Sequence, residues 1–144
     1  MSDIAPKNYV VYRAATPIVV DGHLNDGPWK AAPWTDLFVD IEGDAKPLPR
    51  FATRVMMLWD DEYFYFAADM EEPNVWGTLT KRDSVIYNDN DFEIFIDPDG
   101  DGEHYMEFEM NPLNAAWDLY LPKAYSKGGK ADHDWDFEGI KHAV

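Results

Sequence analysis

The hydrophobic and polar positions along this chain alternate over short segments, in the manner of β-strands. Residues 52–59 and 63–69 are rich in aromatic and aliphatic side chains and are separated by three acidic residues, which predicts a β-hairpin. Residues 92–97 and 105–111 alternate between apolar and polar side chains on either side of a turn rich in Asp and Gly. This period of two predicts a second hairpin with one buried face and one open face.

The remaining segments extend the same pattern. A further strand is expected at residues 116–121, residues 137–144 begin like another strand, and residues 71–90 form a long polar loop with room for one helical turn. No segment shows the 3.6-residue period of a long helix, and no internal repeat is visible. The predicted fold is therefore all-β: a single antiparallel β-sandwich domain spanning residues 1–144, with the two-sheet architecture of immunoglobulin or jelly-roll domains.

Composition narrows the classes of partner. The chain has 144 residues, of which 46% are hydrophobic, so it is able to form an ordinary core. Its net charge of -16 repels phosphate backbones and anionic lipid surfaces. We therefore expect no nucleic-acid partner and no membrane partner, and the charge suits neutral ligands or divalent cations. The absence of cysteine excludes disulfides and cysteine-rich zinc sites.

The sequence leaves two alternatives for location. The N-terminal residues Met1-Ser2-Asp3-Ile4 have neither the basic nor the apolar region of a secretory leader. No stretch approaches the ~20 apolar residues of a membrane-spanning helix. We expect a secreted, periplasmic or cell-surface protein whose leader is not present in this chain, and a cytoplasmic protein is the alternative.

The open face of the second predicted hairpin is the best place to look for chemistry. Glu93 and Glu109 are expected to lie opposite one another, with Cβ atoms ~4.5–5.5 Å apart for a cross-strand pair. Like charges at that distance repel, so a cation, an arginine or a sugar hydroxyl would offset them. A solvated strand face is the plainer interpretation. Paired carboxylates also occur in glycoside hydrolases, where their separation and one raised pKa define the mechanism.

The chain is rich in aromatic residues, with six Trp and eight Tyr. Sugars stack their C–H faces on aromatic rings while carboxylates and amides bond their hydroxyls, so a sugar site is an apolar floor with a few placed polar groups. Trp76, Tyr87 and Trp117 lie near acidic or amide residues in segments that could border the open face, and Trp76 and Tyr87 are expected to be exposed. Core packing is expected instead for Trp29, Trp34 and Trp59.

The turn of the second hairpin has a pattern of oxygen ligands. Asp97, Asp99 and Asp101 alternate with Pro and Gly, as calcium loops do, and match the first half of an EF-hand loop. The match ends there, because the twelfth position from Asp97 is Phe108 rather than a bidentate glutamate. A structural calcium ion held by the three aspartates is one expectation, and an ordinary polar turn is the other.

Five segments combine into a pattern by their order and spacing. They are Val20-Asp21-Gly22 through Trp29, Val55 to Trp59 with Tyr63 to Ala67, Asp91 to Asp97, Tyr105 to Asn111, and Trp117-Asp118-Leu119. Together they resemble the family 9 carbohydrate-binding modules, over roughly residues 17–144. The later segments are similar to the single-domain, family-9-like branch found in bacteria.

The resemblance implies a β-sandwich with structural calcium. It also implies a site that clamps the terminal sugar of a glycan, often at its reducing end, between two aromatic rings. By position, Glu93 matches the family's glutamate that bonds sugar hydroxyls, and Tyr87 lies where the family has its first stacking tryptophan. The expected carbohydrate-binding residues are Tyr87, Glu93, Glu109, Asn111, Trp76 and Trp117.

The chain departs from the family pattern in three ways. Tyr87 is not Trp, and Glu109 lies where the family tends to have an arginine, which inverts the local charge. Family modules also run several tens of residues longer, so we expect the second stacking ring and the last strands to lie beyond residue 144, or another chain to complete the sandwich. An unpaired sheet edge near residues 137–144 would favour self-association.

The expected function is non-catalytic binding of a polysaccharide or a glycan chain end. Two alternatives come from other classes. Some related sandwiches hold haem b for electron transfer, and His104, Met106 and Met110 offer axial-ligand types. A glycoside hydrolase using paired carboxylates is the second alternative, and a structural or interaction module is a plainer third.

Overall fold

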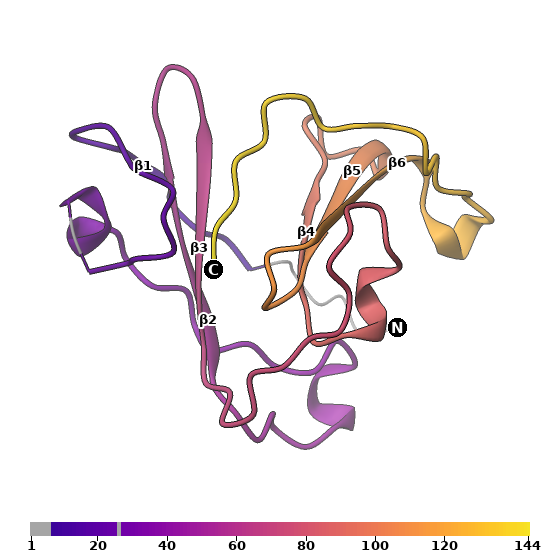
Figure 1. Ribbon diagram of the computed structural model, residues 1–144, viewed down its shortest axis with the longest axis horizontal. Helices are drawn as coiled ribbons and strands as arrows, with labels where there is room; N and C mark the ends of the chain where they lie inside the picture. The colour runs from indigo at the N-terminus through magenta and orange to yellow at the C-terminus, as the bar shows by residue number, and fades with distance from the viewer. Residues whose placement is uncertain (1–6, 26) are drawn as a thin grey trace. The chain divides into compact units, whose positions relative to one another are not determined.

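The computed structural model describes residues 7–25 and 27–144 (Figure 1). The N-terminal residues considered above for a leader, Met1–Ile4, lie outside the described part of the chain. Contacts divide the chain into two compact units. The first unit contains the residues up to Val19 together with His23–Pro73, and the second contains Val20–Gly22 together with Asn74–Val144. Each unit is described by itself.

The first unit contains a three-stranded sheet in the order β1-β2-β3. Strands β2 (Thr53–Trp59) and β3 (Phe64–Met70) are antiparallel, which confirms the first predicted hairpin. The short strand β1 (Tyr12–Arg13) pairs with β2 in parallel. The turn between β2 and β3 is fixed by Asp60, whose carboxylate accepts two backbone N–H groups of the following residues.

The core of the first unit forms around Trp29, in the 3-10 helix η1 (Gly27–Ala31). Its indole meets the ring of Tyr65 edge-on, with ring centroids 6.5 Å apart, and Trp34 packs against the same cluster. The core positions predicted for Trp29 and Trp34 are therefore confirmed. The same prediction for Trp59 is wrong, because Trp59 ends β2 beside the turn and its side chain is 40% exposed.

The second unit contains an antiparallel sheet in the order β4-β5-β6, drawn in orange tones in Figure 1. Strands β4 (Phe92–Ile96) and β5 (Glu103–Met110) form the second predicted hairpin, and β6 (Ala116–Lys123) is the further strand expected from its apolar pattern. The strand expected from residue 137 onward is wrong: residues 137–144 are irregular. Gly139 adopts a left-handed conformation in a turn there, which interrupts the extended backbone that a ladder needs.

The fold is all-β, as predicted, with two three-stranded sheets of the kind that a β-sandwich requires. Among the described residues the only helices are short 3-10 turns: η1, η2 (Gly43–Ala45), η3 (Ile86–Asn88) and η4 (Tyr125–Lys127). The helical turn expected within residues 71–90 is η3. No helix in the described part of the chain is long and apolar enough to cross a membrane.

One expectation about the second sheet is wrong. The face that carries Glu107 and Glu109 was expected to be open, but both side chains are buried. The pairing register explains this, because Glu107 lies opposite Leu119, and Glu109 opposite Trp117. The apolar residues of β6 therefore share the face of the glutamates and form a core cluster there with Ile86. We call this side of β4-β5-β6 the glutamate face.

A buried polar network holds the loop that leads to η3. Asp89 accepts hydrogen bonds from the backbone N–H groups of Thr78 and Leu79 and from the Thr78 hydroxyl, at 2.7–2.9 Å. Asn111 donates to Asp89 and to the Leu79 carbonyl, and its Oδ1 accepts the N–H groups of Leu113 and Ala115. Asn111 thereby uses both its donors and its acceptor inside the protein.

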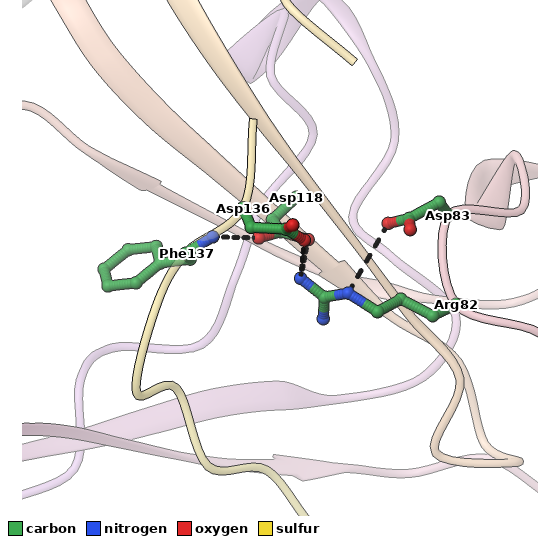
Figure 2. Close-up of polar contacts among 5 residues, drawn as sticks. All are labelled: Arg82, Asp83, Asp118, Asp136 and Phe137. Carbon is green, nitrogen blue, oxygen red and sulfur yellow. Dashed lines mark hydrogen bonds and ion pairs between the residues drawn. The ribbon is translucent and has the colours of Figure 1, made fainter. Parts of the chain in front are cut away.

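A charged cluster on the opposite side of β6 fixes the C-terminal segment (Figure 2). Asp118 is fully buried and accepts hydrogen bonds from Arg82 Nη2, at 2.6 Å, and from the backbone N–H of Phe137. Arg82 Nη2 also reaches Asp136 at 2.9 Å, and its Nε lies 3.7 Å from Asp83. The single guanidinium therefore offsets part of the repulsion among three carboxylates.

We predict that Asn111→Ala lowers the free energy of unfolding by about 2–3 kcal/mol, because it leaves several buried donors and acceptors without a partner. Urea denaturation followed by tryptophan fluorescence measures this change. The matched control is Asn90→Ala, since Asn90 is exposed in the same loop region. Equal stability of the two variants would contradict the importance of the network.

Candidate functional site

A pocket of about 680 Å³ lies on the glutamate face of the second unit. Its floor comes from all three strands of the sheet, and its walls come from η3 and from the loop that follows β6. The residues that line it are Tyr87, Glu93, Glu107, Glu109, Trp117, Leu119, Tyr125, Lys130, Ala131 and His133. The lining thus combines aromatic rings with carboxylates, as a ligand site does.

The register of the sheet brings the floor residues together. Glu93 on β4 lies opposite Glu109 on β5, as predicted, and Glu109 lies opposite Trp117 on β6. The neighbouring row on the same face pairs Glu107 with Leu119. Side chains two residues apart on one strand point to the same side, so the three glutamates share one surface.

The aromatic walls are tied to the glutamates by hydrogen bonds. The backbone N–H of Tyr87 donates to Glu109 Oε2 at 3.1 Å, and the hydroxyl of Tyr125 donates to Glu107 Oε2 at 2.8 Å. Trp117 is buried between Tyr87, whose ring centroid is 6.0 Å away, and His133, which stacks on it at 5.3 Å. Tyr87 and Tyr125 remain at least half-exposed and present their rings to solvent.

A glycine sets the path of the loop after β6. Gly128 ends η4 in the left-handed region, and the next residue, Gly129, passes so close to β6 that a Cβ there would lie 1.8 Å from the Lys123 carbonyl oxygen. Only glycine permits this approach. The approach turns the loop back over the sheet, which places Lys130 and His133 at the pocket.

The carboxylates of the pocket are strongly coupled. Burial raises the pKa of Glu109 to about 8, and three neighbouring carboxylates add to this shift. Glu109 is therefore mostly protonated at neutral pH and has an O–H to donate. The neighbours that raise its pKa are, in decreasing order, Glu93, Glu107 and Asp91.

The pKa values of Asp91 and Glu107 are also raised by burial and by the charge of Glu93. Burial raises the pKa of Asp91 to about 6, and the charge of Glu93 adds to the shift. Burial also raises the pKa of Glu107, partly opposed by the hydrogen bond from Tyr125. One carboxylate oxygen from each of Asp91, Glu93 and Glu109 lies within 4.8 Å of the others. We call these three residues the pocket triad.

The structure brings together four of the six residues predicted for carbohydrate: Tyr87, Glu93, Glu109 and Trp117 line one pocket. Trp76 is 49% exposed, as predicted, but does not line it. Asn111 lies outside the pocket in the network with Asp89. The strand alternation could have indicated Glu107, whereas nothing in the sequence indicated the remaining members, Leu119, Tyr125, Lys130, Ala131 and His133.

The three aspartates predicted for calcium also converge. Carboxylate oxygens of Asp97, Asp99 and Asp101 lie within 4.8 Å of one another in the β4–β5 turn. Asp97 already accepts the N–H groups of Gly100 and Gly102, at 3.0 and 2.8 Å, so the turn is closed by its own hydrogen bonds. Carboxylate oxygens keep further lone pairs, and an all-oxygen donor set fits calcium.

The residues considered as haem ligands do not line the pocket. His104 is exposed at the start of β5, and its Nδ1 lies 2.7 Å from the hydroxyl of Tyr120. Met106 and Met110 point to the side of β5 opposite the glutamate face, because they alternate with Glu107 and Glu109. This arrangement does not favour the haem alternative.

We predict that the free energy of unfolding falls as the pH rises from 4.5, the ordinary pKa of Glu109, to about 8. The unfolded chain loses this proton near the ordinary value while the folded chain keeps it, so folding binds protons across that interval. Glu109→Gln should reduce the slope and stabilise the protein at about pH 8 by about 2 kcal/mol.

Urea denaturation at both ends of the interval measures the slope. Glu103→Gln is the matched control, because Glu103 is exposed on the same strand and should leave the slope unchanged. A Glu109→Gln slope equal to that of the unchanged protein would contradict the coupling in the pocket.

Comparison with known proteins agrees with this geometry. Residues 20–133 of the 144 match the model of a family described as carbohydrate family 9 binding domain-like. Searches of curated proteins and of solved structures gave no significant match. The match covers most of the chain, including every residue that lines the pocket. The chain therefore belongs to the carbohydrate family 9 binding domain-like family, a family of carbohydrate-binding domains.

Proposed function

We propose that the pocket on the glutamate face binds a sugar unit of a polysaccharide or glycan chain end and does not cleave it. The observation that carries the proposal is the combination, in one pocket, of half-exposed tyrosine rings with a row of carboxylates. Rings take up the apolar faces of a sugar, and carboxylates take up its hydroxyls, so both parts of the ligand find a partner.

The rings have the right exposure for stacking. Tyr87 and Tyr125 come from separate segments, and each is anchored through a hydrogen bond to a buried glutamate. Such anchoring reduces the conformational entropy that a side chain or loop loses when ligand binds. Trp117 is buried under Tyr87 and His133, and we assign it to the floor rather than to a stacking surface.

The glutamates offer different partners to sugar hydroxyls. Glu93 is exposed at the pocket and presents carboxylate oxygens. Glu109, protonated at neutral pH because its pKa is about 8, also presents a donor. A hydroxyl is both donor and acceptor, so one sugar hydroxyl is able to bond with both residues at once.

A raised pKa on one of two facing carboxylates is also a property of a general acid in a glycoside hydrolase. The binding experiments therefore include an assay for release of reducing ends. Binding without release supports the proposed function, and release that Glu93→Gln abolishes would replace it with catalysis.

We predict that Tyr87→Ala weakens binding about 10- to 100-fold, because stacked aromatic contacts are worth roughly 1–3 kcal/mol. Glu93→Ala should reduce binding below detection while leaving the fold intact. A glycan array identifies a soluble ligand, and titration calorimetry then measures the dissociation constants.

Tyr12→Ala is the matched control for the stacking residue. Tyr12 is 56% exposed, close to the 61% of Tyr87, but belongs to the first unit. It should bind as the unchanged protein does. Unchanged affinity in both Tyr87→Ala and Glu93→Ala would exclude this pocket as the ligand site.

We also propose that Asp97, Asp99 and Asp101 hold a structural calcium ion in the β4–β5 turn. Support comes from their convergent oxygens and from hard-oxygen donor chemistry. The ion would neutralise part of a turn that carries three like charges. It would stabilise the hairpin that positions Glu93 and Glu109 without contacting the sugar.

We predict that calcium raises the melting temperature and that a chelator reverses the increase, since a ligand that binds only the folded state stabilises it. Differential scanning fluorimetry measures both. Asp99→Asn should abolish the calcium response without opening the turn, because the side chains that accept the hydrogen bonds of the turn are Asp97 and Asp101. A melting temperature that calcium leaves unchanged would contradict the proposed calcium site.

A further inference from the structure

We infer that the pocket selects glycans that carry a free, protonated amine, the amino sugars, over neutral sugars and sugar acids. This inference rests on the proposed sugar-binding function of the same pocket and goes further by naming the class of sugar. It depends on the pocket triad of Asp91, Glu93 and Glu109, and on the absence of a cation from that triad.

The geometry of the triad suits an ammonium group. One oxygen from each carboxylate lies within 4.8 Å of the other two. A point no more than about 2.8 Å from all three oxygens therefore exists, within the length of a hydrogen bond between a cationic nitrogen and a carboxylate. A primary ammonium has three N–H donors, one for each oxygen.

The triad has unmet bonding capacity. Oδ2 of Asp91 is buried and lacks a hydrogen-bond partner among the described residues. Glu109 is only 1% exposed, yet it lines the pocket and is drawn close to two other acids. Burying acids in this way costs free energy unless a donor or a cation compensates them.

A second trio in the same chain shows how such a cluster is compensated. Carboxylate oxygens of Asp83, Asp118 and Asp136 also lie within 4.8 Å of one another. There the guanidinium of Arg82 reaches all three residues (Figure 2). No ion pair joins the pocket triad to a lysine or arginine of the described residues. The cation that the pocket triad lacks is therefore one that a ligand would supply.

The surroundings favour a cation attached to a sugar over a bare metal ion. Calcium takes six to eight oxygen ligands, more than three acids readily supply. An amino sugar uses the triad and the aromatic wall together, because the backbone N–H of Tyr87 is bonded to Glu109 and Tyr87 lines the same pocket as Glu93. A ring face near a cation adds further attraction. A sugar acid would add a like charge and be repelled.

The test compares three oligosaccharides of equal length and β-1,4 linkage: glucosamine, N-acetylglucosamine and glucose oligomers. Titration calorimetry is done at about pH 6, where such an amine is charged. We expect the glucosamine oligomer to bind at least tenfold tighter than the other two. Equal affinities would overturn the selectivity while leaving sugar binding in place. No binding of any oligosaccharide would overturn the proposed function as well.

Variants distinguish attraction of the amine by the triad from its attraction by the overall negative charge of the protein. Glu93→Gln should reduce the preference for the glucosamine oligomer to about threefold or less. Glu109→Gln should change the preference less, because Glu109 already carries a proton at pH 6. Glu103→Gln removes one charge from an exposed position on β5 and should keep the full preference. Glu93 is exposed, so its variant tests the inference even if Glu109→Gln fails to fold.

Two further outcomes would overturn the inference. Equal loss of preference in Glu103→Gln and Glu93→Gln would show that net charge alone attracts the amine. Calcium binding that Glu93→Gln abolishes, measured by titration with calcium chloride alone, would assign the triad to a metal ion.

Discussion

The burial of two glutamates side by side on one strand is the constraint on which the second unit depends. The register of β4, β5 and β6 places Glu107 and Glu109 among apolar residues of β6, where ionised carboxylates are costly. The structure offsets the cost with hydrogen bonds from Tyr125 and from the backbone of Tyr87, and by keeping Glu109 protonated. Those same hydrogen bonds attach two loops to the sheet. The residues that stabilise the buried acids therefore also form the walls of the pocket.

The chain deals with clustered carboxylates in two different ways. Around Asp118 it provides its own cation, Arg82, and the result is a closed structural cluster that ties the C-terminal segment to β6. No lysine or arginine of the described residues pairs with the pocket triad, and two of its members, Glu93 and Glu109, line a cavity instead. A buried charge cluster with an internal counter-ion has little to offer a ligand. One without a counter-ion gains free energy from any ligand that brings the missing charge.

The sequence was most informative where periodicity was local. Segments rich in apolar residues located the first hairpin, and the period of two located the second and set Glu93 opposite Glu109. The polar loop around Tyr87 correctly indicated an exposed ring. The sequence could not show which face of the second sheet was covered. That depends on the register between β5 and β6 and on the return of the loop through Gly129, and both are set by long-range contacts. Trp59 was misplaced for a similar reason, since its exposure follows from its position at a strand end.

The carboxyl group that titrates near neutral pH, Glu109, is a different residue from Asp89, which holds the loop of the pocket in place. Burial alone would raise the pKa of Asp89, but hydrogen bonds from Leu79, Thr78 and Asn111 hold it at about 2. A lowered carboxylate pKa contributes stability that persists above its ordinary value and is lost only when the pH falls toward 2. The loop that carries Tyr87 therefore keeps its anchor when Glu109 in the folded protein loses its proton near pH 8. A change of pH around 8 consequently alters the charge of the pocket floor while the aromatic wall stays in place.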